Sequence, residues 1–473
     1  MITRKIKKST RQLFSDLYDL GNVLGTPVYV VGGFVRDLLL GTENKDIDFV
    51  VLDDALRFAR RFKRKHPASS LAIFQKFGTA MIRFDDYKLE FVTARRESYT
   101  EGSRKPKVKK ADLNTDLRRR DFTANAIAMD ISPENFGRLI DPLRGSRDLE
   151  KKTLRTPLDP DITFSDDPLR MLRAVRFAVQ LSFQIEKYTF QSIKRTAPRL
   201  KIISQERIRD EFNKIVLTPR PSDGINLLNE ACLLDIFLPE FVATMGTEQR
   251  KNYHHKDVYR HTLQVLDKVA ADSDKLDLRL AALFHDIAKP RTKRFDVGVG
   301  WTFHGHEVVG ERMTGAILRR MKYPAQTINY VKKIVRQHLR PMFLVDDVVT
   351  DSAIRRLLFL AGDEFDDLMT LCRADITSKN PRTVRQHLQN YKIVMEKAKI
   401  VEEKDRLRAF KSPVDGLEIM KIFNITPGPQ VGRIKKFVEE AILDGELPNE
   451  HDAALNYLLE NKSKFILTTS GND

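Results

Sequence analysis

The pattern of hydrophobic positions changes along the chain near residue 158. Before that point, short apolar runs such as Phe49–Leu52, Ala80–Phe84 and Leu89–Val92 alternate with segments in which apolar residues recur every three or four positions. The short runs predict buried strands, and the spacing of three and four predicts amphipathic helices. Beyond residue 160 the helical spacing continues through most of the chain. We therefore expect the α+β fold class, with a mixed-sheet domain followed by a mostly α-helical remainder.

Length implies more than one domain. A single hydrophobic core rarely grows beyond roughly 250 to 300 residues, and this chain has 473. We expect four segments, namely a head over residues 1–158, a helical neck over 159–225, a helical body over 226–385 and a helical tail over 386–473. Within the head, the stretch from Arg95 to Thr115 is rich in basic residues and poor in hydrophobic ones, which predicts a loop.

Charge narrows the class of partner. The chain holds 82 Lys and Arg against 65 Asp and Glu, for a formal net charge of +17. This excess favours a polyanion, and nucleic acid fits better than a membrane because no uncharged stretch is long enough to span a bilayer. The basic N-terminal segment lacks the apolar core of a signal peptide, so we expect a cytoplasmic protein. Cys232 and Cys372 lie far apart, which predicts neither a disulfide framework nor a cysteine metal site.

A glycine turn precedes two alternating carboxylates. The apolar run Val28–Val31 predicts a strand, and Gly32 and Gly33 allow a sharp turn into a helix whose free N–H groups can hold an anion. Asp46 and Asp48 alternate along the next strand and therefore share one face of it. Such a pair could hold two magnesium ions roughly 4 Å apart, one for an attacking hydroxyl and one for a leaving pyrophosphate. Either motif alone is better explained by a plain turn or a surface acidic pair, but both in this order favour a nucleotidyltransferase site.

Further polar groups extend this candidate site. Glu90 lies on a later strand, where it is either a third carboxylate or an ordinary exposed glutamate. Arg119, Arg120 and Asp121 stand beside an expected helix start that includes Asn125, and guanidinium groups suit triphosphate and ribose oxygens. Some of these arginines could instead pair with neighbouring aspartates for structural reasons.

The first helix after the head carries a second set of candidates. Asp167 precedes Pro168, an order that predicts an N-cap followed by the first helical residue. Arg170 lies three positions after Asp167 on the same helical face, and Arg173 and Arg176 follow it. A carboxylate and a guanidinium on one face can hydrogen-bond a base edge, so that protein side chains act as the template. The alternative interpretation is a helix cap and a surface arginine.

In this order the motifs resemble those of the class II tRNA nucleotidyltransferases and bacterial poly(A) polymerases, a branch of the polymerase β superfamily. The resemblance covers about residues 25–215 and ends at Gln205–Glu211, which is similar to the family's neck motif. It implies a polymerase β-like head in which Asp46 and Asp48 bind catalytic Mg²⁺, with Glu90 beside them. The nucleotide-binding residues that we expect are Gly32, Gly33, Arg36, Arg119, Arg120, Asp121, Asn125, Asp167, Arg170, Arg173 and Arg176. One departure is Asp166, where the family usually has glutamate.

A second constellation lies in the helical part of the chain. The adjacent His285 and Asp286 end an apolar helix pattern, with further histidines before and after them. This order resembles the HD phosphohydrolase superfamily, and such a domain would have its core over about residues 250–380. Imidazole and carboxylate suit divalent metals. The ligands of a divalent metal of unknown identity that the resemblance implies are His261, His285, Asp286, His306, His338 and Asp375. Hydrolysis at this site and a purely stabilising metal are both left open.

The resemblance implies an enzyme that adds CCA to the 3′ end of tRNA from CTP and ATP without a nucleic-acid template. Its expected partners are tRNA, ATP and CTP, with no membrane and no obligate protein partner. The alternatives within the same chemistry are a poly(A) polymerase and an enzyme that adds only CC or only A. A phosphohydrolase with an RNA-binding head, or a catalytically silent RNA-binding protein, is disfavoured because Asp46 and Asp48 are both present.

Overall fold

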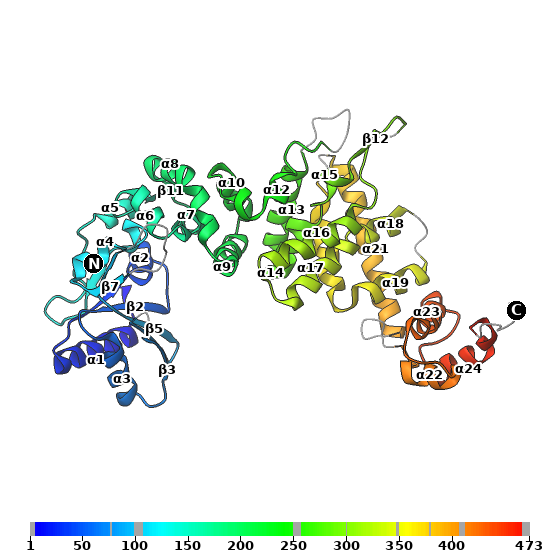
Figure 1. The fold of residues 1–473 in the computed structure, drawn as a ribbon, viewed down its shortest axis with the longest axis horizontal. Coiled ribbons are helices and arrows are strands. Elements are labelled where there is room, and N and C mark those ends of the chain that lie inside the picture. The colour runs from blue at the N-terminus through cyan, green and yellow to red at the C-terminus, as the bar shows by residue number, and fades with distance from the viewer. Residues whose placement is uncertain are drawn as a thin grey trace, which may run out of the picture. The chain divides into compact units, whose positions relative to one another are not determined.

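The computed structural model describes eight stretches of the chain, residues 5–75, 78–98, 107–248, 257–298, 300–346, 350–377, 380–405 and 412–465. The chain divides into two compact units, Met1–Phe237 and Leu238–Asp473. Figure 1 shows that the first unit combines strands and helices and that the second is largely helical. The expected boundaries after residues 225 and 385 fall inside helices α10 (Pro221–Glu230) and α21 (Pro381–Asp405). The finer four-part division stays a prediction.

The N-terminal unit is built on a seven-stranded mixed sheet. In spatial order its strands are β3 (Ser70–Phe74), β4 (Thr79–Phe84), β5 (Tyr87–Thr93), β2 (Asp46–Val51), β1 (Val28–Val31), β8 (Ala128–Asp130) and β9 (Leu139–Ile140). Strands β2 and β5 pair in parallel, and the other neighbours are antiparallel. The α+β class and the mixed sheet are therefore confirmed.

The two faces of β2 have different tasks. On one face Phe49 stacks on Phe91 at 5.1 Å between ring centroids and meets the edge of Phe14, which belongs to helix α1 (Lys8–Leu24). Helix α3 (Ala55–Lys65) covers the same face through Phe58. Because side chains alternate along a strand, Asp46, Asp48 and Val50 point to the opposite face. There Val50 joins a small core with helix α4 (Leu113–Arg118). The aromatic face fixes the strand, and the other face presents its carboxylates.

The stretch from Arg95 to Thr115 is not simply a loop. Strands β6 (Arg95–Ser98) and β7 (Lys107–Lys110) pair antiparallel, and α4 begins at Leu113. Residues 99–106 between the strands lie outside the described part of the chain. Backbone hydrogen bonds hold a two-stranded ladder together, and basic side chains do not prevent them. The basic composition of this stretch therefore did not predict its secondary structure.

The remaining elements of the N-terminal unit are mostly helical. Within the head they are α2 (Gly33–Leu40), η3 (Thr123–Asn125), α5 (Gly145–Glu150) and β10 (Thr153–Leu154). After the head they are α6 (Pro160–Asp166), α7 (Leu169–Leu181), β11 (Gln184–Ile185), α8 (Lys187–Thr196), η4 (Ala197–Ile202), α9 (Gln205–Val216), α10 and α11 (Leu234–Phe237). Helix α7 packs against both α9 and α10. Gly224 permits the close packing of α10 on α9, since a Cβ atom there would lie 2.4 Å from Ile215 Cγ2.

The C-terminal unit is almost entirely helical. Its elements before the last helices are α12 (Pro239–Val242), α13 (Val258–Asp272), α14 (Leu276–Phe284), α15 (Lys289–Thr292), β12 (Arg294–Asp296), β13 (Gly300–Thr302), α16 (His306–Arg320), α17 (Ala325–Gln337), α18 (Arg340–Asp346), α19 (Asp351–Ala361), η5 (Gly362–Glu364), α20 (Phe365–Asp375) and α21. The last elements, which share a small apolar core around Val438, are α22 (Gly416–Phe423), α23 (Pro429–Asp444), α24 (His451–Glu460) and η7 (Lys462–Lys464). Within the described ranges, every helix is too short or too polar to cross a bilayer.

Candidate active site and metal centre

The glycine turn lies directly against one of the two alternating carboxylates. Gly32 follows β1 with a φ of 74°, a left-handed backbone that favours glycine. A Cβ atom at Gly32 would lie 3.0 Å from Arg120 Nη1 and 3.3 Å from Asp48 Oδ2. Any larger residue would therefore push into the space between this guanidinium and this carboxylate. The turn, Arg120 and Asp48 form one small site.

Three carboxylates lie on the same face of β2 and β5. Asp48 and Glu90 are direct partners in the parallel register, and Asp46 begins β2 two residues before Asp48. Burial and the neighbouring Glu90 raise the pKa of Asp48 to about 6, although Arg120 opposes the shift. A raised pKa indicates that the protein alone supplies too little positive charge here. A divalent cation at Asp46 and Asp48 would supply it, so the residues fit a bound metal.

These carboxylates are spread rather than converged. Among the described residues, sets of three ligand atoms within 4.8 Å of one another occur in the C-terminal unit, and Asp46, Asp48 and Glu90 do not form one.

Arg36 is buried and already has protein partners. Its side chain is 5% exposed, Nε donates to Asp37 Oδ1 at 2.7 Å, and Nη1 donates to Asn125 Oδ1 at 2.8 Å. The guanidinium carbon also lies 5.1 Å from the ring centre of Phe177. Direct contact between Arg36 and a triphosphate therefore stays a prediction, and this geometry favours a role in holding the turn.

Asp121 joins the head to helix α7. It accepts hydrogen bonds from its neighbour Phe122 N at 2.8 Å, from Asn125 Nδ2 at 3.1 Å and from Arg173 Nε at 2.9 Å. Burial alone would raise the pKa of Asp121, but the Arg173 guanidinium outweighs burial and holds the pKa well below its ordinary value. Asp121 and Arg173 thus form an ion pair that Asn125 extends, and this partner of Asp121 was not anticipated from the sequence.

Two arginines share a second buried aspartate. Asp116 accepts from Arg119 Nε at 2.9 Å and from Arg120 Nη2 at 3.2 Å. Burial would raise the pKa of Asp116, but the guanidinium groups of Arg120 and Arg119 hold it below its ordinary value. Arg120 also lies beside Asp48 at Gly32, so its guanidinium connects this cluster to the carboxylates of β2.

The proposed base-reading residues lie at the start of α7. The helix begins at Leu169, one residue later than expected, and Asp167 Oδ1 still accepts from Leu169 N at 3.2 Å, as a cap would. The other carboxylate oxygen is 3.2 Å from Arg207 Nη2, a partner on α9 that sequence reasoning missed. Arg170 Nη2 donates to the Arg119 backbone carbonyl at 2.7 Å.

Arg176, further along α7, lies beside an acidic residue rather than at the base-reading end. Its Nε atom is 3.2 Å from Glu211 Oε2, and its guanidinium carbon is 4.2 Å from the ring centre of Phe177. Glu211 belongs to the neck segment on α9. Arg176 therefore helps to pack α7 on α9, and its expected contact with nucleotide stays a prediction.

The histidine cluster in the C-terminal unit is converged. Two sets of ligand atoms lie within 4.8 Å, namely His261, His285 and Asp286, and Asp286, His306 and His338. Asp286 belongs to both sets through different oxygens, with Oδ2 3.2 Å from His285 Nε2 and Oδ1 3.3 Å from His306 Nε2. Asp375 completes the group, with Oδ1 2.9 Å from His261 Nε2. All six expected residues come together from five segments of the chain.

The outer ring nitrogens are held so that the inner ones converge. The Nδ1 atoms of His285, His306 and His338 lie 2.7–2.8 Å from the backbone carbonyls of Ala282, Phe303 and Val335. This fixes Nε2 as the free ligand atom, as in histidine metal sites. His261 Nδ1 lies 2.9 Å from Thr377 Oγ1, a partner that sequence reasoning missed. The arrangement fits divalent metal, with Asp286 as a shared carboxylate.

Electrostatics of this cluster reflect the crowding of charged and ionisable groups. Burial would lower the pKa of His285, but Asp286 and Asp375 outweigh it and raise the pKa to about 10. Burial and the neighbouring His285 instead lower the pKa of His338 to about 3. Lys289 Nζ lies 2.6 Å from Asp286 Oδ2.

His254 and His255 lie outside the described residues.

A mixed sheet that presents alternating carboxylates beside a glycine turn defines the nucleotidyltransferase class of enzymes. Three family models match successive parts of the chain. They are the poly A polymerase head domain at residues 28–155, the probable RNA and SrmB- binding site of polymerase A at residues 182–245, and the HD domain at residues 258–361.

Relatives resemble nearly the whole chain. An A-adding tRNA nucleotidyltransferase of Deinococcus radiodurans is 33% identical over 435 residues, which cover 90% of this chain and 93% of the relative. A CC-adding tRNA nucleotidyltransferase of Thermus thermophilus is 30% identical over 90% of this chain and 92% of the relative. The solved Thermotoga maritima CCA-adding enzyme complexed with tRNA is 22% identical, with a TM-score of 0.59 over 97% of both chains, and shares the fold. The chain belongs to the family of tRNA nucleotidyltransferases and bacterial poly(A) polymerases, which confirms the family predicted from the motifs.

Proposed function

We propose that this protein adds CCA to the 3′ end of tRNA from CTP and ATP, with the two nucleotides selected by protein side chains. The observation that supports the proposal is the close approach of Gly32 to both Asp48 and Arg120, so that a turn suited to phosphate would lie beside a carboxylate suited to a metal. The family membership and the full-length tRNA nucleotidyltransferase relatives support tRNA as the acceptor. The net charge of +17 suits a polyanionic substrate.

The chain's own residues divide the work of nucleotidyl transfer. Asp46 and Asp48 would hold Mg²⁺, and Glu90 would act as a third carboxylate or hold a metal-bound water. The metal, when bound, lowers the pKa of the attacking ribose hydroxyl and offsets charge on the leaving pyrophosphate. The first backbone N–H groups of α2 and the guanidinium of Arg120 would face the triphosphate. Asp167 would accept a hydrogen bond from the base edge, and Arg170 would donate one to it.

The number of nucleotides added has a second candidate answer. The Deinococcus radiodurans relative, which is similar to this chain over 93% of its own length, is A-adding. An enzyme of that kind would use ATP alone on tRNA that already ends in CC. The Thermus thermophilus relative is CC-adding and marks the complementary outcome. Poly(A) addition is the remaining alternative within the same chemistry.

One product assay separates these outcomes. Purified protein and magnesium are incubated with three tRNA transcripts that lack CCA, lack CA or lack only the terminal A, and CTP, ATP or both are supplied. Products that stop after CCA on all three transcripts support the proposal. Addition of a single A to the third transcript alone supports the A-adding candidate, CC without A supports the CC-adding one, and a long A tail supports a poly(A) polymerase. No addition to any transcript contradicts nucleotidyl transfer to tRNA.

For the C-terminal unit we propose a divalent metal centre at the histidine cluster, with phosphohydrolase activity as the second candidate function. The convergence of four Nε2 atoms and two carboxylates supports metal binding. Metal analysis of the purified protein tests it, with His285→Ala as the comparison. Hydrolysis of an activated phosphodiester, assayed across Mg²⁺, Mn²⁺, Co²⁺, Ni²⁺ and Zn²⁺, tests the activity. A metal-loaded protein without hydrolysis would assign the centre a stabilising role.

A further inference from the structure

Two side chains link the glycine turn to the start of the metal-binding strand. Asn44 Oδ1 accepts from Asp46 N at 2.8 Å, and Asn44 Nδ2 donates to Asp37 Oδ2 at 2.7 Å. The other oxygen of Asp37 accepts from Arg36 Nε at 2.7 Å. Hydrogen bonds therefore run without a break from the buried guanidinium of Arg36 to the backbone of Asp46. We call Asp37 and Asn44 the clamp pair.

The clamp pair lies directly beneath the turn. A Cβ atom at Gly33 would be 3.8 Å from Arg36 Nη2 and 3.9 Å from Asn44 Nδ2. The turn that would hold the triphosphate thus rests on the same groups that fix the first residue of β2. A displacement of either group would therefore shift both the glycine turn and the start of β2.

The orientation of Asn44 is forced by its partners. Its oxygen must face the Asp46 N–H, and its amide nitrogen must face the Asp37 carboxylate, because the reverse would set donor against donor and acceptor against acceptor. An asparagine whose oxygen accepts from the N–H two residues later bends the chain locally. This contact defines where β2 begins, and therefore where Asp46 places its carboxylate.

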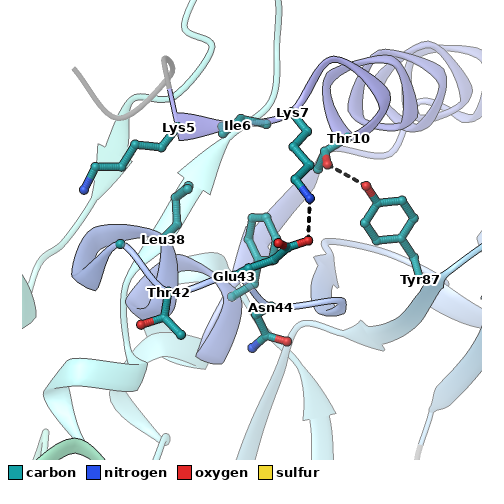
Figure 2. Close-up of a pocket in the computed structure, with 11 residues that line it drawn as sticks. Lys5, Ile6, Lys7, Thr10, Leu38, Thr42, Glu43, Asn44 and Tyr87 are labelled. Atoms are coloured by element: carbon teal, nitrogen blue, oxygen red, sulfur yellow. Dashed lines mark hydrogen bonds and ion pairs between the residues drawn. The ribbon is translucent and has the colours of Figure 1, made fainter.

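Packing alone does not hold this loop. The segment Thr42–Asn44 borders a cavity of about 330 Å³, which Lys5, Lys7, Phe34 and Tyr87 also line (Figure 2). The contact across this cavity is an exposed ion pair of 2.6 Å between Lys7 and Glu43, with side chains 63% and 58% exposed. Exposed pairs contribute little. With open space on one side, the loop is held on the other side by the clamp pair and by a backbone hydrogen bond from Thr42 N to Asp37 O at 2.8 Å.

We propose that Asp37 and Asn44 are positioning residues for nucleotidyl transfer, which set Asp46 in register with the glycine turn. The proposal rests on the proposed function of that site. The side-chain contacts of Asn44 are to Asp37 and the backbone of Asp46, so loss of the clamp pair should act through metal and nucleotide rather than through tRNA. Partners behind metal-binding groups typically affect metal affinity or activity by about 10- to 100-fold.

The first test removes the clamp. In Asn44→Ala, kcat should fall and the Mg²⁺ concentration for half-maximal rate should rise, each by about 10-fold or more, while tRNA affinity changes less than about twofold. A readout without turnover is calorimetric binding of CTP in the absence of tRNA, with and without Mg²⁺. The Mg²⁺-dependent part of that binding should weaken. The control is Glu43→Gln, one residue away in the same loop and outside the clamp.

The second test restores the clamp with opposite polarity. In Asp37→Asn the amide oxygen can accept from only one of Asn44 Nδ2 and Arg36 Nε, so a donor meets a donor at the other contact, and Asn44→Asp sets two carboxylates against each other. The double variant keeps net charge, and an amide at position 37 can again donate to a carboxylate at position 44, which still accepts from Asp46 N. The double variant should recover Mg²⁺-dependent CTP binding by at least about tenfold over Asn44→Asp, because residues in direct contact are not additive.

The outcomes separate this inference from the proposed function. If wild-type protein adds no nucleotide, the proposed function fails, and CTP binding still reports on the clamp. If Asn44→Ala matches Glu43→Gln in CTP binding and in Mg²⁺ dependence, the positioning role is overturned. A folded double variant that is no better than the worse single variant overturns direct pairing of the two side chains. Thermal unfolding of every variant identifies any that fail to fold, and Asn44→Ser, which keeps an acceptor for Asp46 N, then replaces Asn44→Ala.

Discussion

The buried ion pair between Asp121 and Arg173 makes a measurable contribution to the N-terminal unit. Asp121 is 7% exposed and accepts from two donors besides Arg173. In Asp121→Asn the side-chain oxygen can still serve those two donors, but the new amide N–H₂ group faces the guanidinium. The charge left without its partner is that of Arg173, whose side chain is 33% exposed. Its loss of a partner should therefore cost less than a fully buried charge would, about 1 to 3 kcal/mol. At about 1.4 kcal/mol per tenfold, the folding equilibrium constant should fall by about one to two powers of ten.

The assay can use the two units as mutual controls. Trp301 is the only tryptophan and belongs to the C-terminal unit, so its fluorescence follows that unit. Urea unfolding followed by circular dichroism should show a less stable N-terminal unit in the variant. The midpoint of the unfolding transition followed by Trp301 fluorescence should stay the same. Asp223→Asn is the matched substitution, since Asp223 and Arg220 form a pair with side chains 52% and 72% exposed. It should cost less than about 1 kcal/mol.

The effect should also depend on pH. Because the folded pKa of Asp121 lies below its unfolded value, its contribution to stability is present above the unfolded pKa of about 3.9 and is lost as pH falls through the folded pKa. The difference between wild type and Asp121→Asn should be full at neutral pH and should shrink below about pH 4. Equal unfolding of Asp121→Asn and Asp223→Asn at neutral pH would refute the inferred buried pair.

Further substitutions separate the two centres and the base-reading helix. Asp48→Asn should lower nucleotide addition by at least about a thousandfold and change tRNA affinity less than about twofold, as measured by filter binding. Arg170→Ala should change the ratio of kcat/KM for CTP and ATP by about 10-fold or more, since a base-edge contact is worth about 1 to 3 kcal/mol, and an unchanged ratio contradicts base reading. His285→Ala combined with Asp286→Ala should remove the metal found by elemental analysis while retaining nucleotide addition. Joint loss of metal and addition would instead indicate that the centre stabilises the whole chain.

The carboxylate pair was predictable because it depends on local periodicity. Asp46 and Asp48 are two residues apart in an apolar strand, so any register of β2 places them on one face. The sequence offered Glu90 either as a third carboxylate or as an ordinary exposed glutamate, because its position beside Asp48 depends on which strands pair in parallel. The histidine cluster was found in the same way as the motifs of the head, by the order of its residues, although its six members come from five separate segments.

The arginines were harder to assign. A guanidinium that binds phosphate and one that binds a buried carboxylate have the same sequence signature, and the partner is often distant along the chain. Arg36 meets Asn125, 89 residues away, and Arg173 meets Asp121, 52 residues away. Asn44 was missed for the opposite reason, since its contacts are local and one asparagine in a loop carries no distinguishing pattern.

The pairing of these arginines determines where positive charge is left for a triphosphate. Four guanidinium groups face acidic side chains, those of Arg36, Arg119, Arg173 and Arg176. Arg120 shares the carboxylate of Asp116 with Arg119 and also lies beside Asp48 at Gly32, so its charge is offset as well. Arg170 donates to a backbone carbonyl and so keeps its own charge. The head therefore offers much less free positive charge than its count of arginines suggests, and a triphosphate depends on the metal and the backbone N–H groups of α2 for the rest. Nucleotide binding, and not only catalysis, should accordingly require the divalent ion.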